Sequence, residues 1–196
     1  DVDTDSMAVL APEKYPMAGR TTHEVTIGVY DVKSDKTIYL KVGNPKDRYF
    51  VNIGWSPDGK TIYLKEFNRK QNEMSLDAYD AVTGDKRATL YTERHEKYIT
   101  SYTSVAFLPW DADKFIIQSQ KDGYNPLYLF NTKGEMLRQL TSGNFVVYDL
   151  LGFDKARKRA IILSAESSPI QSNLYAVDIA TGKRTLLDNG RGVHAN

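Results

Sequence analysis

The acidic start of the chain is the first place where residue types could do chemistry. Asp1, Asp3 and Asp5 imitate the opening of an EF-hand calcium loop. The sixth position is Ser6, where that loop needs glycine, and the twelfth is Pro12, where it needs glutamate. The three histidines lie far apart without ligand spacing, and the chain contains no cysteine. We therefore predict no metal site, no cofactor and no thiolate chemistry.

Side chains suited to binding gather in two polar stretches, NRKQN and TERHEKYITSY. The candidates for a substrate-side surface are Arg69, Gln71, Arg94, His95, Tyr98 and Tyr102. They could line an extended subsite, because binding residues usually sit on loops over a rigid scaffold. The alternative for Arg69 and Gln71 is a structural bridge from the loop to the next blade's backbone, and for the second stretch a mobile turn. No G-x-S-x-G nucleophile motif occurs, so no catalytic residue is assigned.

Four similar hairpins stand behind these stretches. Each hairpin has two short apolar strands around a turn, and a polar residue closes its first strand. These closing residues are Asp31, Asp80, Asn131 and Asp178. They recur about every 50 residues, which is typical of a repeat architecture.

A second pair of strand-like runs lies between successive hairpins, as in YFVNIGW and TIYLKEF around the tight turn SPDGK. Four short strands per repeat predict an all-β, partial β-propeller of about three and a half four-stranded antiparallel blades. We expect residues 1–196 to be a single fragment of such a domain. Its parts are an outer hairpin at 25–42 and blades at about 49–91, 101–140 and 145–188.

Antiparallel strands reverse direction at each turn, so alternate turns share one end of the blades. The loops expected at the candidate end are 43–48, 68–73, 92–101, 121–125, 141–144 and 166–172. Arg69 and Tyr98 should then lie at one end, and Asp58 and Gly84 at the other. Aromatic residues of the inner strands are expected to pack between blades. These are Tyr49, Trp55, Phe107 and Phe145.

Composition limits the partners. With 26 Lys and Arg against 25 Asp and Glu, the chain has no charge excess to attract nucleic acid or anionic lipid. No apolar run reaches membrane-spanning length, and the start lacks the pattern of a signal peptide. The two open ends of a partial propeller should expose apolar faces. We therefore expect a homo-oligomer, or an N-terminal segment, Asp1 to Gly19, that folds back over one edge.

Four stretches in order resemble the propeller of dipeptidyl peptidase IV-like serine peptidases of the prolyl oligopeptidase clan. They are EKYPMAGRTTHEVTIGVYDV, IYLKEFNRKQNEMSLDAYDAVTG, KDGYNPLYLFNTKGEMLRQLTSGNFVV and SNLYAVDIATGKRTLLDNGRGVH. The resemblance implies an eight-bladed propeller that caps an α/β-hydrolase domain, which removes dipeptides from peptide N-termini. Such enzymes are commonly dimers, and bacterial ones are usually exported, for example to the periplasm. The hydrolase domain and the paired glutamates that hold the substrate ammonium are absent from this chain.

Two functions remain open. The first is the non-catalytic N-terminal propeller segment of a dipeptidyl peptidase IV-like exopeptidase. It would gate and help shape the site for peptide substrates, with the α/β-hydrolase domain of the same polypeptide as its partner. The alternative is a stand-alone bacterial periplasmic interaction propeller of the transport-associated type. NRKQN and KDGYNPLY favour the first.

Overall fold

A computed structural model describes residues 10, 12, 14, 17, 19–100 and 103–194. All regular elements in these residues are strands, arranged in four antiparallel sheets. The first sheet is a hairpin of β1 (Gly28–Asp31) and β2 (Lys36–Tyr39). Expectations that concern Asp1, Asp3, Asp5 and most of the segment up to Gly19 lie outside the described residues.

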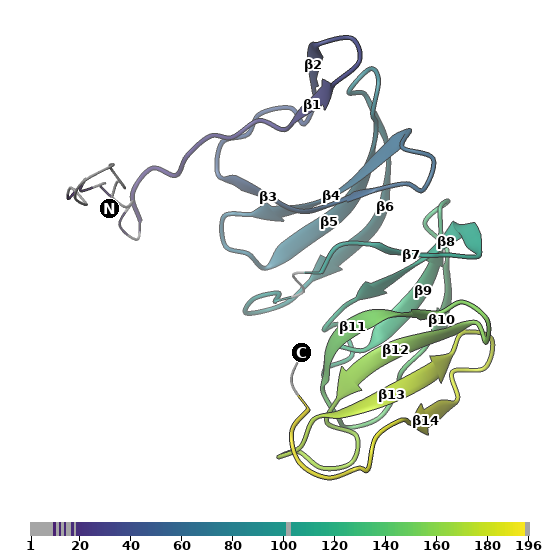
Figure 1. Cartoon of the computed structure of the whole chain (residues 1–196). Helices are drawn as coiled ribbons and strands as arrows, with labels where there is room; N and C mark the ends of the chain where they lie inside the picture. The colour runs from purple at the N-terminus through teal and green to yellow at the C-terminus, as the bar shows by residue number, and fades with distance from the viewer. Residues whose placement is uncertain are drawn as a thin grey trace.

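Three four-stranded sheets follow the hairpin, and we call them blades 1, 2 and 3. Blade 1 contains β3 (Arg48–Trp55), β4 (Thr61–Asn68), β5 (Glu73–Asp80) and β6 (Lys86–Arg94). Blade 2 contains β7 (Ala106–Leu108), β8 (Asp111–Gln118), β9 (Leu127–Asn131) and β10 (Met136–Gln139). Blade 3 contains β11 (Val147–Asp154), β12 (Arg159–Ser164), β13 (Asn173–Asp178) and β14 (Arg184–Leu186). Strands pair in chain order within each blade, and the blades follow one another through the molecule (Figure 1), so the predicted partial β-propeller is confirmed.

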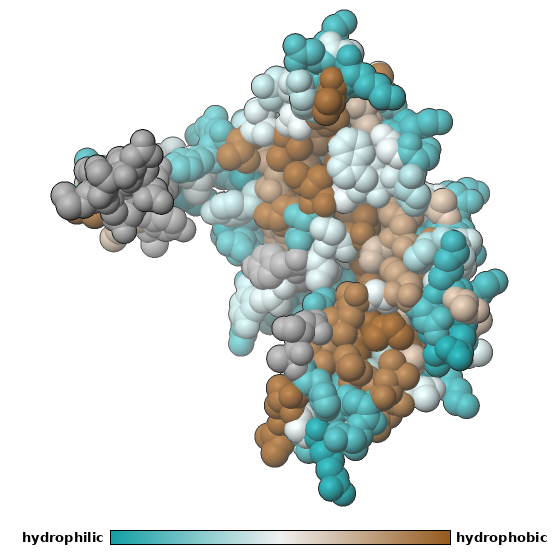
Figure 2. All heavy atoms as spheres, in the orientation of Figure 1, coloured by the Kyte–Doolittle hydropathy of each residue, from teal (hydrophilic) through white to brown (hydrophobic). Residues whose placement is uncertain are grey.

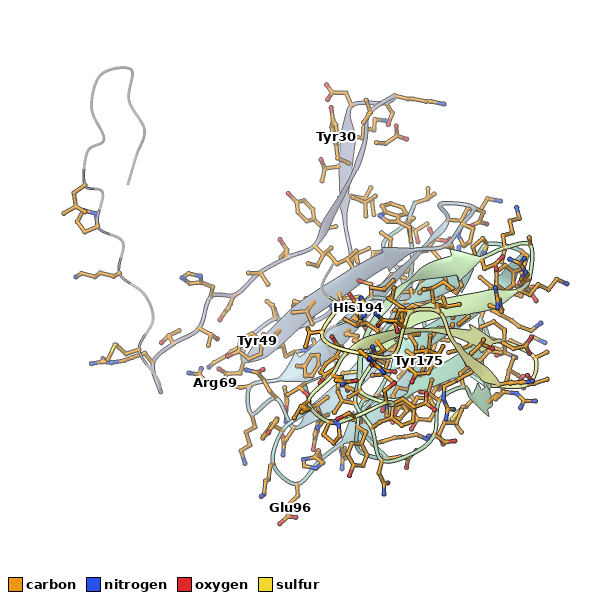
Figure 3. The ribbon with its side chains drawn as sticks, turned by 60° about the horizontal axis from the view of Figure 1, so that its bottom comes forward. Tyr30, Tyr49, Arg69, Glu96, Tyr175 and His194 are labelled. Atoms are coloured by element: carbon orange, nitrogen blue, oxygen red, sulfur yellow. The ribbon has the colours of Figure 1, made fainter. Side chains whose placement is uncertain are left out.

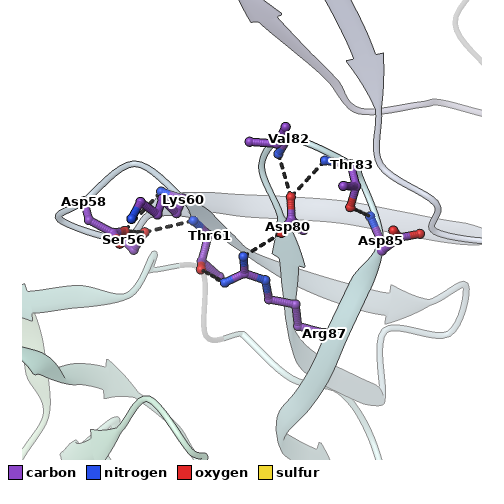
Figure 4. A network of polar contacts seen from close by, with 9 residues as sticks. All are labelled: Ser56, Asp58, Lys60, Thr61, Asp80, Val82, Thr83, Asp85 and Arg87. Atoms are coloured by element: carbon purple, nitrogen blue, oxygen red, sulfur yellow. Dashed lines mark hydrogen bonds and ion pairs between the residues drawn. The ribbon is translucent and has the colours of Figure 1, made fainter.

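The repeated acidic or amide residue of each hairpin organises its turn. In blade 1, the Oδ1 atom of Asp80 accepts hydrogen bonds of 2.8 Å from the backbone amides of Val82 and Thr83 (Figure 4). Asp31, Asn131 and Asp178 accept equivalent bonds in the other hairpins. A side chain that satisfies turn amides locally explains why this position repeats.

Glycines in the same turns allow the blades to stack. A Cβ atom on Gly84 would collide with the carbonyl oxygen of Tyr39 in β2. A Cβ atom on Gly134 would lie 2.7 Å from the Leu90 carbonyl oxygen, and one on Gly182 would lie 3.1 Å from that of Leu140. Each outer turn therefore sits directly on the last strand of the preceding sheet, an approach that only glycine permits.

Apolar side chains fill the spaces between sheets. One cluster joins the β1–β2 hairpin to blade 1, a second joins blade 1 to blade 2, and a third joins blade 2 to blade 3. On the face shown in Figure 2, apolar residues gather in the middle of the molecule between more hydrophilic ends. Among the described residues, no helix is long and apolar enough to cross a membrane.

The expectation for the inner-strand aromatics is confirmed for Phe107 and Phe145, which pack against the clusters between blades. Tyr49 packs against a cluster formed within blade 1 and by Ile99. Trp55 is instead 50% exposed. It pairs with Ile62 on the face of blade 1 that turns towards the β1–β2 hairpin, and this hairpin has too few strands to cover the innermost strand β3.

Candidate functional site

The turn between β4 and β5 carries the first two candidate residues. Arg69 donates to Asp47 Oδ1 at 2.6 Å and also hydrogen-bonds the carbonyl oxygen of Arg20. Gln71 has a left-handed backbone (φ 54°), and its carbonyl oxygen accepts the Ile99 amide at 2.8 Å. Arg69 thus joins the blade to the segment that precedes the β1–β2 hairpin, and not to the backbone of the next blade as the structural alternative had it.

The segment after β6, residues 95–100, carries His95 and Tyr98. The His95 Nδ1 atom accepts hydrogen bonds from the amides of Lys97 and Tyr98 at 3.1 and 3.2 Å, so the imidazole caps the turn. The His95 and Tyr98 rings lie 6.3 Å apart between centroids. Tyr98 is 56% exposed and Arg94, whose ion pair with Glu73 spans 3.5 Å, is exposed as well. Tyr102 lies outside the described residues.

Residues 95–100 are fastened on three sides rather than free. The amide of His95 donates to Asn72 O at 2.9 Å, and the Ile99 side chain is fully buried against Phe67 and Met74. Gln120 of the neighbouring blade bonds the Tyr98 carbonyl through Nε2 and accepts from the Thr100 amide and hydroxyl at 3.0 and 2.6 Å. These contacts attach the segment to both blades and leave Tyr98 on its surface.

The turns lie at the ends that strand alternation predicts. Arg69 follows β4 and Tyr98 follows β6, and backbone bonds between 71–72 and 95–99 join the two segments. Arg87 joins the opposite turns, since it donates to Thr61 at 2.7 Å and to Asp80 at 2.6 Å (Figure 4). Figure 3 shows Arg69 and Glu96 far from Tyr30 of the β1–β2 hairpin. The predicted separation of Arg69 and Tyr98 from Asp58 and Gly84 is confirmed.

Blade 1 also contains a buried charged side chain that sequence reasoning missed. Lys65 of β4 is fully buried, and its burial lowers the pKa of the ammonium group to about 8 although the Glu93 carboxylate opposes the shift. Glu93 accepts from the Ser119 hydroxyl at 2.6 Å across the boundary between blades 1 and 2. The only local signal is a lysine that follows three apolar residues in the run IYLKEF.

Gln120 is the other residue that sequence reasoning missed. It follows β8 in a polar stretch, and nothing around it indicates that it reaches the loop of the preceding blade. Among the described residues, no cluster of three His, Asp or Glu side chains could hold a metal ion. The described part of the candidate end therefore offers hydrogen-bonding and aromatic groups for recognition.

Comparison with protein families finds one match across nearly the whole chain. The model described as "Dipeptidyl peptidase IV (DPP IV) N-terminal region" matches residues 5–195. The "Probable dipeptidyl peptidase 4" of Aspergillus flavus is 26% identical over 178 residues, which are 86% of this chain and 23% of that protein. The "Inactive dipeptidyl peptidase 10" of Mus musculus is 25% identical over 176 residues, 83% of this chain and 22% of that protein.

Solved structures are similar over the same region. A structure from Bacteroides ovatus, assigned to the dipeptidyl aminopeptidase IV type, matches with a TM-score of 0.82 and 42% identity, covering 88% of this chain and 27% of that chain. Porphyromonas gingivalis dipeptidyl peptidase 4 matches with a TM-score of 0.81 and 28% identity, covering 92% of this chain and 25% of that chain. The present chain spans about a quarter of the length of these relatives.

Proposed function

Because this chain belongs to the dipeptidyl peptidase IV N-terminal region family, we propose that it is the non-catalytic propeller segment of a dipeptidyl peptidase IV-like serine exopeptidase. The family match across residues 5–195 is the observation that carries this proposal. The rest of the polypeptide would supply the α/β-hydrolase domain and the remaining blades. The parent enzyme would be exported and act on peptide substrates.

The end that carries residues 95–100 would face the hydrolase domain, gate the entrance and form part of the subsite wall. Support comes from the fastening of this segment by Gln120, Ile99 and Asn72, because a recognition surface gains from being preorganised. Tyr98 offers an exposed ring and Arg94 an exposed guanidinium group there. Arg69 and Gln71 would act as supports for the loop end rather than as contacts to substrate.

Kinetics of the full-length enzyme test this role. Tyr98→Ala should leave turnover of a short dipeptidyl chromogenic substrate unchanged and lower kcat/KM for longer peptides about fivefold, the effect of losing about 1 kcal/mol of contact. Val82→Ala is the matched control, since Val82 is 74% exposed on an opposite-end turn. Equal kinetics of the two variants on long peptides would contradict a subsite role.

The family match favours the exopeptidase segment over the alternative of a stand-alone interaction propeller. The mouse relative whose name reads "Inactive" carries the same region. Membership in this family therefore does not by itself require that the parent protein be catalytic. Reading the parent gene for a downstream G-x-S-x-G motif decides between an active and an inactive parent.

A further inference from the structure

The segment that follows β14 contains the sequence Asp188-Asn189-Gly190-Arg191. Asn189 is exposed, and it is the only asparagine in the sequence that precedes a glycine. Among the other asparagines that are followed by a residue in the sequence, those before proline lack a following N–H group, and the rest precede residues with a Cβ atom. An asparagine side chain next to an unobstructed backbone amide can react with that amide within the chain.

Two hydrogen bonds arrange the reacting groups. The amide of Gly190, the potential nucleophile, donates to Asp188 Oδ1 at 2.7 Å. The carbonyl oxygen of the Asn189 side chain, which is the electrophilic group, accepts the amide of Arg191 at 3.0 Å. The first bond draws the proton away from the nitrogen, and the second polarises the carbonyl carbon. Gly190 has φ +69°, a conformation that residues with a Cβ atom rarely adopt.

We propose that Asn189 is a site of spontaneous deamidation. The Gly190 nitrogen forms a bond to the Asn189 side-chain carbonyl carbon and loses its proton to the Asp188 carboxylate. The bond from that carbon to the side-chain nitrogen breaks, and ammonia leaves with the proton. The product is a cyclic imide between residues 189 and 190. Water then adds to either imide carbonyl and breaks one carbon–nitrogen bond, which leaves aspartate or isoaspartate at 189.

The sequence Asp58-Gly59 provides an internal comparison. Asp58 is also followed by a glycine, but its side chain is a carboxylate. Hydrogen bonds from the Ser56 hydroxyl and the Lys60 amide lower the pKa of Asp58, so it stays ionised. An ionised carboxylate is a poor electrophile, and Asp58 should remain unchanged under conditions in which Asn189 reacts.

Deamidation at 189 would disturb the attachment of the C-terminal segment. Asp188 also accepts the Leu174 amide at 2.7 Å and lies 3.5 Å from His194 Nε2, so it holds residues 188–194 against β13. Two backbone bonds between Ser172 and residues 192 and 194 continue this attachment. A new carboxylate beside Asp188 repels it, and isoaspartate adds a methylene group to the backbone between Asp188 and Gly190.

The test compares the folded chain with the synthetic peptide TLLDNGR, residues 185–191, at mildly alkaline pH. Trypsin releases the same peptide from the protein, and mass spectrometry with isoaspartyl methyltransferase labelling measures conversion at 189. We expect the folded chain to react at least as fast as the peptide, Gly190→Ala to react about tenfold slower because its Cβ obstructs the approach, and Asp58 to stay intact. Hydrogen exchange at the Leu174 amide should accelerate as isoaspartate accumulates.

A folded chain that keeps Asn189 intact while the peptide converts would overturn the proposal. Unchanged conversion in Gly190→Ala would also overturn it, because the reaction would then not pass through the Gly190 nitrogen. Asp188→Asn separates the role of the carboxylate. It should slow conversion in the folded chain severalfold, and a faster reaction in that variant would show that Asp188 protects Asn189.

Discussion

Lys65 shows how one buried charge can shape the stability of the whole chain. Its ammonium group is fully buried between blades 1 and 2, near Glu93. Burying a charged group is unfavourable, because the free energy lost on removing it from water can exceed the free energy gained from a single ion pair. Lys65 therefore contributes to the specific contact of blades 1 and 2 at an expense in stability that depends on pH.

Stability should rise with pH between about 8 and 10. The pKa of Lys65 is about 8 in the folded chain and 10.5 in an ordinary environment, so the unfolded chain binds more protons in this window. The cost of keeping Lys65 charged, on the order of 3 kcal/mol below pH 8, is then relieved as pH rises. Above pH 10 the trend reverses, because burial raises the pKa of Tyr79 to about 12 and unfolding then releases a proton.

Urea unfolding at a series of pH values measures this dependence. Lys65→Met is the control, since it removes the titrating group and should remove the rise between pH 8 and 10. The same rise in the variant and in the parent chain would assign the effect to other groups. Lys65→Gln provides a second comparison if the Lys65→Met chain does not fold because the buried Glu93 carboxylate has lost the nearby positive charge.

Residues 95–100 are held in place by hydrogen bonds from the neighbouring blade. Gln120→Ala removes the three hydrogen bonds that hold Tyr98 and Thr100 to blade 2. We expect faster amide exchange at Thr100 and a loss of about 1 to 2 kcal/mol of unfolding free energy, since each of the three exposed bonds contributes about 0.5 kcal/mol net. Gln139→Ala, which removes one bond to the Thr141 carbonyl just after β10, is the control and should leave Thr100 unchanged. Unaltered exchange at Thr100 in Gln120→Ala would exclude the clamp.

Replacing a turn glycine by alanine should cost more stability where the backbone of the preceding sheet lies against the glycine than where the glycine faces open space. Gly134→Ala places a Cβ 2.7 Å from the Leu90 carbonyl at φ +88°, and should destabilise the chain by about 2 kcal/mol or more. Gly59→Ala has a similar left-handed backbone (φ +68°) but nothing within 4 Å, so only the conformational strain of about 1 kcal/mol remains. Thermal unfolding of both variants measures the difference. Equal losses would show that the turn does not press on blade 1.

At the scale of the whole molecule, blade 3 presents an uncovered face. Leu40, Leu90 and Leu140 occupy corresponding positions on the last strand of each earlier sheet or just after it, and all are at most 8% exposed. The corresponding Leu187 after β14 is 46% exposed. The next outer turn covers each of the first three, and among the described residues nothing covers Leu187.

The isolated 196-residue chain should therefore self-associate at micromolar concentration. Burying a leucine contributes about 2 kcal/mol, and blade 3 offers several apolar side chains beside a free strand edge. Light scattering measures the association, and Leu187→Glu should weaken it while Val82→Glu at an exposed turn should not. A strictly monomeric chain would contradict the expectation.

The same isolated chain should not cleave Gly-Pro or Ala-Pro chromogenic substrates. It contains no G-x-S-x-G motif, and its described surface presents no assembled nucleophile and base. A colorimetric assay with a serine-directed inhibitor checks this. Inhibitor-sensitive turnover by the purified chain would require a catalytic centre elsewhere in its sequence.

Much of the fold was already readable from adjacent residues. The Asp80 side chain binds backbone amides two and three residues away, and Gly84 adopts the positive φ angle of the same turn. Both effects depend only on nearby residues, so the same pattern recurs in each blade. Strand alternation then placed Arg69 and Tyr98 at one end, because antiparallel strands reverse at every turn. The repeat, the all-strand architecture and the location of the candidate loops all follow from such short-range rules.

Contacts between distant parts of the chain were decided only by the tertiary structure. Arg69 reaches Arg20, Gln120 reaches Tyr98 and Lys65 is buried beside Glu93, although no local pattern indicates these partners. Trp55 is exposed because the sheet facing it has two strands instead of four. The physical reason is that burial and hydrogen bonding depend on which surfaces of neighbouring sheets pack together. Such packing brings residues into contact that are far apart in the sequence, and no short sequence pattern specifies these contacts.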